Sequence, residues 1–197
     1  MLARWLRAWE RKLLKPLLFP LTRLGMGPDM VTLAGLVVIV ISGLMLSRGY
    51  LLTGACLLLA GGLLDAADGE LARLTGRETS FGGFLDSVAD HCGDFAVYLG
   101  LLWLSLNNRM GSEVVLIFVA FFGSVFGSLI RSRASMAGVD ARDVGLFTRF
   151  ERILLLALGL LSGKTTAALW VLAVLNNFSA AQRLAYVMRV SRLSRRN

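Results

Sequence analysis

The chain has 197 residues, of which 56% are hydrophobic and only 17% are charged. A soluble domain carries about 25% charged residues, so the composition argues against a soluble protein and predicts an all-α, polytopic membrane protein. The net charge of +8 does not indicate nucleic-acid binding, because the basic residues flank apolar runs, where they orient the chain and contact membrane lipids.

Residues 1–24 predict an amphipathic helix that lies in the membrane interface. Tryptophan and leucine alternate there with arginine and lysine at helical spacing, and three prolines break the pattern before the first apolar run: Pro16, Pro20 and Pro28. The alternative is a disordered basic tail, in which two tryptophans and many leucines would have no use. No cleavable signal peptide is expected, because the first strongly apolar run begins only near Met30 and lacks a small-residue cleavage site at its end.

Six transmembrane helices are predicted within a single domain over residues 25–197. A span needs about 20 mainly apolar residues, and six segments qualify: 30–47, 51–75, 82–106, 113–136, 145–162 and 165–189. Turn-forming or polar residues separate them: Ser47-Arg48-Gly49, Thr75-Gly76-Arg77, Asn107-Asn108-Arg109, Gly138-Val139-Asp140 and Ser162-Gly163-Lys164. Cys56 and Cys92 fall inside two of the spans and are predicted to be small core residues without a disulfide.

The distribution of lysine and arginine predicts the orientation in the membrane. Six spans place both termini on one side, and 18 of the 21 basic residues lie on that side, all but Arg48, Arg109 and Lys164. Basic residues mark the cytoplasmic side. The sequence therefore predicts a multi-pass protein of the cell membrane with both termini in the cytoplasm.

A row of aspartates stands at the cytoplasmic ends of the second and third spans. Asp65 and Asp68 are three residues apart, Asp86 and Asp90 are four apart, and Asp94 extends the second row by another turn. Residues at these spacings share a helix face. If the two spans form an antiparallel hairpin, four carboxylates converge on one point near the membrane surface.

This convergence needs compensating positive charge. Each carboxylate in a span costs about 2.5–3.5 kcal/mol on insertion scales, and two like charges about 4 Å apart add on the order of 4 kcal/mol at an effective dielectric of about 20. Hard oxygen ligands favour Mg²⁺, Mn²⁺ or Ca²⁺, and four carboxylates suffice for two ions. The alternative, neutralisation by interhelical arginine, needs nearby partners, and only Arg73 and Arg77 are close in sequence.

The aspartates belong to a longer pattern. It runs Asp65-Ala66-Ala67-Asp68-Gly69-Glu70-Leu71-Ala72-Arg73, then eight residues, Gly82, three residues, Asp86, three residues and Asp90. Its eight fixed positions over 26 residues resemble the complete signature of the CDP-alcohol phosphotransferase family. The layout of six spans and an interfacial helix is similar to that family too.

The resemblance implies a role for each position. Asp65, Asp68 and Asp86 would hold metal, and Asp90 would bind a second ion and act as base on the acceptor hydroxyl. The cofactor would be Mg²⁺ or Mn²⁺, as two ions. A further set would line the pocket for the CDP-lipid: Thr32, Gly69, Ala72, Arg73 and Gly82.

Three residues near this signature have open roles. Where the family has Pro-Asn-x-x-Thr, this chain has Asp29, which can accept hydrogen bonds or cap the helix but cannot donate as an amide does. His91 is expected to be structural or lipid-facing, since it points about 100° away from Asp90 on a helix. Asp94 is expected either to support the metal ligands or to pair with an arginine.

Arginines in the last three spans bear on the acceptor alcohol. Arg131, Arg133, Arg152 and Arg183 lie at or just inside the cytoplasmic ends, in segments similar to those of phosphatidylinositol-phosphate synthases and their archaeal-lipid counterparts. Arginine is suited to bidentate phosphate binding, so the predicted acceptor is a phosphorylated alcohol such as inositol 1-phosphate. The alternatives are anchoring of helix ends, contact with lipid head groups, or glycerol 3-phosphate as acceptor.

The predicted reaction is transfer of a phosphatidyl-type group from CDP-diacylglycerol or CDP-archaeol to that alcohol, with release of CMP. A rival from another class is a divalent-cation transporter, since membrane aspartates also mark ion paths. Against it, the four carboxylates lie near one side, and the other halves of the spans contain a single acidic residue, Glu113, at the very start of its span. The resemblance also implies a homodimer.

Overall fold

The computed structural model describes residues 25–140, 144–145 and 147–194, and the predicted interfacial helix over residues 1–24 lies outside them. Within the described residues the fold is all-helical, as predicted. Its helices are α2 (Pro28–Ser47), α3 (Leu51–Thr75), α4 (Ser80–Asn107), α5 (Gly111–Met136), α6 (Arg149–Leu161) and α7 (Thr165–Ser194).

Each of the five predicted breaks holds a residue with left-handed backbone. These residues have φ between +56° and +83°: Gly49, Gly76, Arg109, Gly138 and Gly163. Four of the five are glycine, which adopts this conformation without the steric cost that a Cβ brings. The predicted breaks therefore mark the actual helix ends on both sides of the bundle.

Helix α6 is shorter than the predicted span over residues 145–162. It begins at Arg149 because Thr148 and Glu151 form a capping box, in which the Thr148 amide donates to the Glu151 carboxylate at 2.7 Å. Gly145, just upstream, has φ +114° and cannot continue a helix. A Cβ there would also lie 2.6 Å from the Ser179 hydroxyl oxygen of α7.

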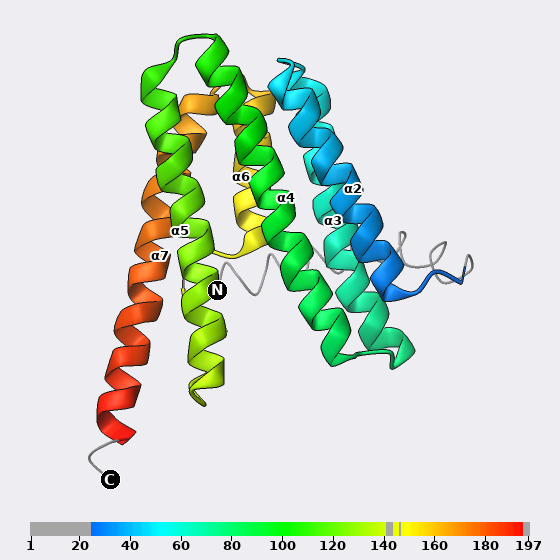
Figure 1. Ribbon diagram of the computed structural model, residues 1–197, viewed down its shortest axis with the longest axis vertical. Coiled ribbons are helices and arrows are strands. Elements are labelled where there is room, and N and C mark those ends of the chain that lie inside the picture. Colours follow the sequence, from blue (N-terminus) through cyan, green and yellow to red (C-terminus); the bar gives the residue numbers. More distant parts are fainter. Residues whose placement is uncertain (1–24, 141–143, 146, 195–197) are drawn as a thin grey trace.

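The helices form two groups, which are joined by α6 and by contacts between α4 and α5 (Figure 1). Helix α2 packs against α3 and α4, α5 pairs with α7, and α6 lies between α3 and α7. In Figure 1 the α2–α3, α4–α5 and α6–α7 turns gather at the upper end, while the α3–α4 turn lies toward the lower end. The main core lies between the two groups and includes Leu46, Leu101, Leu169 and Leu172.

Small residues let helix backbones touch. A Cβ on Gly100 of α4 would stand 2.2 Å from the carbonyl oxygen of Gly43 on α2, so these helices cross in backbone contact. Between α5 and α7, the Asn176 amide donates to the carbonyl of Ala120 at 2.9 Å. Small residues and interhelical amide hydrogen bonds are the usual means of packing helices within a membrane.

The outer surface of the bundle is apolar. Large side chains such as Val37, Phe122 and Trp170 are more than half exposed, as expected of helices that face lipid. Among the described residues, α2, α3 and α5 are long and apolar enough to cross a membrane. Helices α4 and α7 carry polar rows that lower their hydropathy, and α6 has only 13 residues.

The prediction that Cys56 and Cys92 belong to the core is wrong. Both are exposed on the outside of their helices, and both are free thiols. An outward cysteine is tolerated there because the surroundings of a membrane helix are as apolar as its core. The prediction that they form no disulfide is confirmed.

Candidate active site

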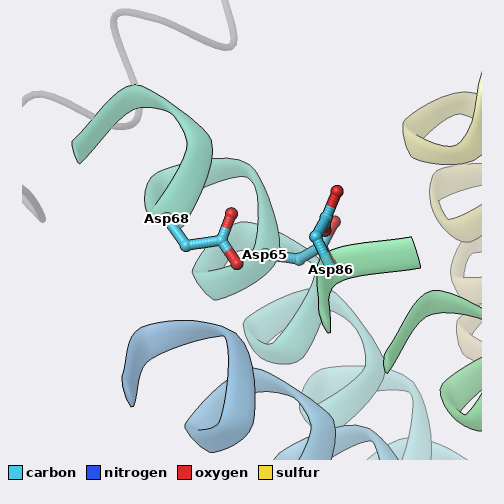
Figure 2. Close-up of side chains that lie close together, drawn as sticks. All are labelled: Asp65, Asp68 and Asp86. Atoms are coloured by element: carbon cyan, nitrogen blue, oxygen red, sulfur yellow. The ribbon is translucent and has the colours of Figure 1, made fainter. Parts of the chain in front are cut away.

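Three aspartates from two helices meet at the lower end of the α3–α4 hairpin. Asp65 and Asp68 lie on α3 and Asp86 lies on α4, and each offers a carboxylate oxygen within 4.8 Å of the others (Figure 2). The turn that joins the helices is short, and Thr79 caps α4 by accepting from the Gly82 amide at 2.9 Å. This tight hairpin brings the two acidic faces together, as the spacing predicted.

The donor set fits a divalent cation. Three hard carboxylate oxygens at this separation match the ligand type that Mg²⁺ and Mn²⁺ prefer. Asp68 is buried, with 5% of its surface exposed, and its carboxylate accepts a hydrogen bond from the Thr32 hydroxyl. A buried carboxylate so close to two others is costly without a cation between them.

Asp90 lies beside Asp65, outside the three carboxylates that meet within 4.8 Å, and it pairs with an arginine. One terminal guanidinium nitrogen of Arg149 lies 2.6 Å from Asp90 and 2.5 Å from Asp65. The expectation that only Arg73 and Arg77 are near enough to neutralise the aspartates is therefore wrong. Arg149 reaches the cluster from α6, although it lies 59 residues after Asp90 in the sequence.

Asp94 extends the acidic row into the bundle, where it pairs with arginines. Its carboxylate lies 3.7 Å from Arg149 and 3.8 Å from Arg152, and it accepts from the Ser124 hydroxyl at 2.7 Å. Of the two roles considered for Asp94, pairing with arginine is the one observed.

A cavity of about 260 Å³ adjoins Asp68 and Asp86. All five residues predicted for the CDP-lipid pocket line it: Thr32, Gly69, Ala72, Arg73 and Gly82. Its wall also includes Asp29, Arg77 and Thr79. Residues from α2, α3 and α4 thus enclose one polar space directly beside the carboxylate triad.

Glycine positions shape this cavity. A Cβ on Gly82 would stand 3.1 Å from the Thr79 hydroxyl and 3.2 Å from the Asp29 carboxylate, so a side chain would crowd the entrance. The N-cap of α2 is Gly27, and Asp29 lies within the first turn. Asp29 therefore does not cap the helix and instead places its carboxylate at the cavity wall.

The predicted acceptor arginines differ in their surroundings. The guanidinium of Arg183 lies within electrostatic range of those of Arg131 and Arg152, so these three form one basic cluster. Arg183 is 9% exposed and donates to the carbonyls of Val144 at 2.7 Å and Gly127 at 3.1 Å. It therefore also fastens the α5–α6 connection to the bundle. Arg133 is exposed.

Arg149 is the site residue that the sequence did not single out. It occupies the first position of α6, where the helix dipole disfavours positive charge. The one local signal in the sequence is the Thr148–Glu151 capping pair, which makes Arg149 the first residue of a helix, where an arginine is favoured only with an acidic partner nearby.

The fold and site together define a class of protein: a helical membrane protein whose carboxylate cluster borders a polar cavity, an arrangement suited to metal-dependent chemistry on phosphorylated substrates. The sequence pattern of the CDP-alcohol phosphatidyltransferase family matches residues 26–182, and the chain belongs to this family. It is a transferase of phospholipid synthesis.

Relatives and solved structures are similar over most of the chain. The archaetidylinositol phosphate synthase of Methanothermobacter thermautotrophicus is 34% identical over 84% of this chain and 85% of its own length. The phosphatidylinositol phosphate synthase of Mycobacteroides abscessus is 34% identical over 88% and 82%.

Two crystal structures of the Mycobacterium tuberculosis phosphatidylinositol phosphate synthase share this fold. The structure with CDP-DAG bound has a TM-score of 0.79 and 31% identity over 89% of this chain and 94% of that one. The structure with manganese and citrate has a TM-score of 0.81 and 31% identity over 89% and 88%.

Proposed function

We propose that this transferase moves a phosphatidyl-type group from a CDP-lipid to the hydroxyl of inositol 1-phosphate and releases CMP. The observation that carries the proposal is the placement of two opposite charge clusters side by side. Asp86 of the acidic triad lies within electrostatic range of Arg131 and Arg149, and Arg131 in turn neighbours Arg183. A diphosphate and a phosphorylated acceptor need such adjoining sites.

The names of the related proteins support the proposed donor and acceptor substrates. A related structure contains CDP-DAG, and relatives named for archaetidylinositol phosphate and phosphatidylinositol phosphate differ in their lipid but share inositol phosphate. Both names favour inositol phosphate as the acceptor. They leave diacylglycerol and archaeol as alternative lipids.

The residues of the site have three separate roles in the proposed reaction: metal binding, nucleotide binding and proton transfer. Asp65, Asp68 and Asp86 would hold divalent metal, Mg²⁺ or Mn²⁺ as two ions with Asp90 contributing to the second, and bound metal neutralises the diphosphate. The cavity residues, Thr32 and Arg73 among them, would hold the cytidine diphosphate. Asp90 takes the proton from the acceptor hydroxyl, whose oxygen attacks the lipid-side phosphorus while CMP leaves.

The acceptor's phosphate would lie against the basic cluster. A guanidinium group binds phosphate through paired N–H donors. The proposed acceptor site has three such groups beside the acidic triad, those of Arg131, Arg152 and Arg183. Arg133 is retained as a fourth candidate. Arg183 offers fewer free donors than the others, because two of its nitrogens already bind backbone carbonyls.

The proposed setting is the cell membrane, with six spans and with both termini and the active site on the cytoplasmic side. The distribution of basic residues supports this orientation. A homodimer is part of the proposal. The divalent-cation transporter is not supported, because the chain belongs to a family of transferases.

The test is CMP release by purified protein in lipid nanodiscs. Inositol 1-phosphate is expected to be used far better than free inositol or serine, with glycerol 3-phosphate as the nearest competitor. Activity should vanish in EDTA and return with excess Mg²⁺ or Mn²⁺. Equal use of free inositol would rule out a phosphate site, preferred use of glycerol 3-phosphate would replace the acceptor, and full activity without metal would overturn the metal site.

A further inference from the structure

Arg149 forms the most concentrated set of ion pairs among the described residues. Its guanidinium lies against the carboxylates of Asp65, Asp90 and Asp94, at 2.5, 2.6 and 3.7 Å. The side chain is 13% exposed. Gly93 faces it, and a Cβ there would lie 3.5 Å from one of its terminal nitrogens, at ordinary contact distance.

Asp65 belongs to two clusters at once. It pairs with Arg149, and it also offers an oxygen to the triad with Asp68 and Asp86. A cation held by the triad and the guanidinium of Arg149 would therefore share one carboxylate. Like charges at such short range repel strongly in a site removed from water, so each weakens the binding of the other.

Asp90, like Asp65, forms an ion pair with Arg149. Its contact with a guanidinium nitrogen is 2.6 Å, so one carboxylate oxygen is occupied and is not available to a substrate hydroxyl. Any event that draws Arg149 away from Asp90 would free this carboxylate.

We propose that Arg149 is an internal counterion that stands in for metal within the aspartate cluster. It leaves Asp65 and Asp90 when divalent metal binds, so that the carboxylate oxygens it occupied become available to the metal and, at Asp90, to the acceptor hydroxyl. This inference rests on the proposed metal site. Arg149 is a positioning residue here: it stabilises the cluster without metal and links metal loading to the release of Asp90.

Its position on α6 suits such a movement. Arg149 is the first residue of the helix, so its long side chain can change rotamer while the capping box of Thr148 and Glu151 keeps the backbone in place. Arg152, one turn further along, keeps a charge contact with Asp94. Asp94 therefore retains a partner while Arg149 moves.

The experiment measures Mn²⁺ binding to full-length protein in nanodiscs by electron paramagnetic resonance of free Mn²⁺, without lipid substrate or acceptor. Arg149→Gln is expected to bind Mn²⁺ about 10-fold more tightly than the unaltered protein, within the roughly 5- to 150-fold range of coupled sites. Arg149→Lys, which keeps the charge, should bind nearly as the unaltered protein does. Arg48→Gln is the matched control, because it removes a charge at the opposite end of the bundle.

Thermal unfolding supplies a second measurement. Arg149→Gln should lower the melting temperature in EDTA, and the increase in melting temperature on adding Mn²⁺ should be larger than in the unaltered protein, because metal then replaces the missing charge. A role limited to packing would lower the melting temperature equally with and without Mn²⁺. That result, or unchanged or weaker Mn²⁺ binding by Arg149→Gln, overturns the inference.

The unaltered protein gives an independent test if Arg149→Gln does not fold. Modification of Arg149 by phenylglyoxal, located by mass spectrometry, should increase when Mn²⁺ is added. Unchanged or decreased modification contradicts displacement. If the unaltered protein binds no Mn²⁺ at all, the proposed metal site itself fails, and this inference fails with it.

Discussion

The carboxylate of Asp90 has one partner in the structure and a different predicted role in the reaction. It pairs with Arg149 at 2.6 Å, and it is also the residue that the family signature points to as the base. We expect Asp90→Asn to lower the turnover number about 10²- to 10⁴-fold, the usual loss for a general base. The Michaelis constant for CDP-lipid should change little, because the cavity residues lie elsewhere.

The measurement is steady-state CMP release with each substrate varied in turn. Glu113→Gln is the control, because it removes a carboxylate that ties Ser105 to Thr166 at the opposite end of the bundle. Near-normal turnover in Asp90→Asn would mean that another group takes the proton, and Asp94 would be the next residue to test.

Arg152 is the clearest test of the phosphate site. Its side chain is 19% exposed and its ion pair with Asp94 is long at 3.8 Å, so this contact leaves donors for a ligand. A hydrogen bond to a charged group contributes about 1.5–3 kcal/mol, and Arg152→Gln should therefore raise the Michaelis constant for inositol 1-phosphate about 10- to 100-fold. The constant for CDP-lipid should stay unchanged.

The same kinetic assay should separate the other arginines. Arg133→Gln is expected to have the smallest effect, because Arg133 lies two positions after Arg131 and points to another side of the helix. Arg183→Gln should also destabilise the protein, since it removes two hydrogen bonds to backbone carbonyls. If Arg152→Gln alters both Michaelis constants alike, Arg152 does not distinguish the acceptor.

Local spacing was enough to predict the acidic triad. Asp65, Asp68 and Asp86 lie on two adjoining helices, so a helical hairpin alone brings them together. Arg149 could not be found that way, because its partnership depends on how α6 packs against α3, a long-range contact that spacing does not contain. The sequence predicted Asp90 as a metal ligand and base, and the structure shows that its carboxylate also pairs with Arg149.

At the scale of the helices, the crossing of α2 and α4 depends on glycine. Gly100→Ala would put a methyl group 2.2 Å from the Gly43 carbonyl oxygen, so the two helices must move apart. Overpacking of this kind costs about 1–3 kcal/mol. We expect a lower melting temperature, measured by thermal unfolding in detergent.

Gly111→Ala is the matched control for this prediction, because a Cβ at Gly111 meets nothing within 4 Å. It should leave the melting temperature nearly unchanged. Equal melting temperatures for the two variants would show that α2 and α4 adjust to the added methyl group without cost.

Most helix boundaries could be predicted because each break carries its own local signal. Glycine or a polar turn residue stops the helix, and the observed ends of α2, α3 and α5 lie within two residues of the prediction. The start of α6 was missed, although the Thr148–Glu151 capping box is present in the sequence. The apolar run extended the predicted span back to Gly145, whose positive φ and close approach to Ser179 of α7 are features of the folded chain.

At the scale of the molecule, the open question is whether all six helices cross the membrane. Helix α6 has 13 residues, about 20 Å at 1.5 Å per residue, which is less than the roughly 30 Å hydrocarbon core. Yet the α6–α7 turn lies at the same end of the bundle as the α2–α3 and α4–α5 turns (Figure 1). We infer that α6 starts below the membrane surface, at the depth of the aspartates, and still reaches the far side.

Single cysteines in a background of Cys56→Ala and Cys92→Ala test this topology. A membrane-impermeant maleimide applied to intact cells should label Ser112→Cys, in the first turn of α5, and Ser162→Cys, which follows α6. Ser135→Cys, near the exposed end of α5, should be labelled only after permeabilisation. Labelling of Ser162→Cys only after permeabilisation would mean that α6 returns without crossing, and the arrangement with both termini in the cytoplasm would then have to be abandoned, because an odd number of spans separates the termini.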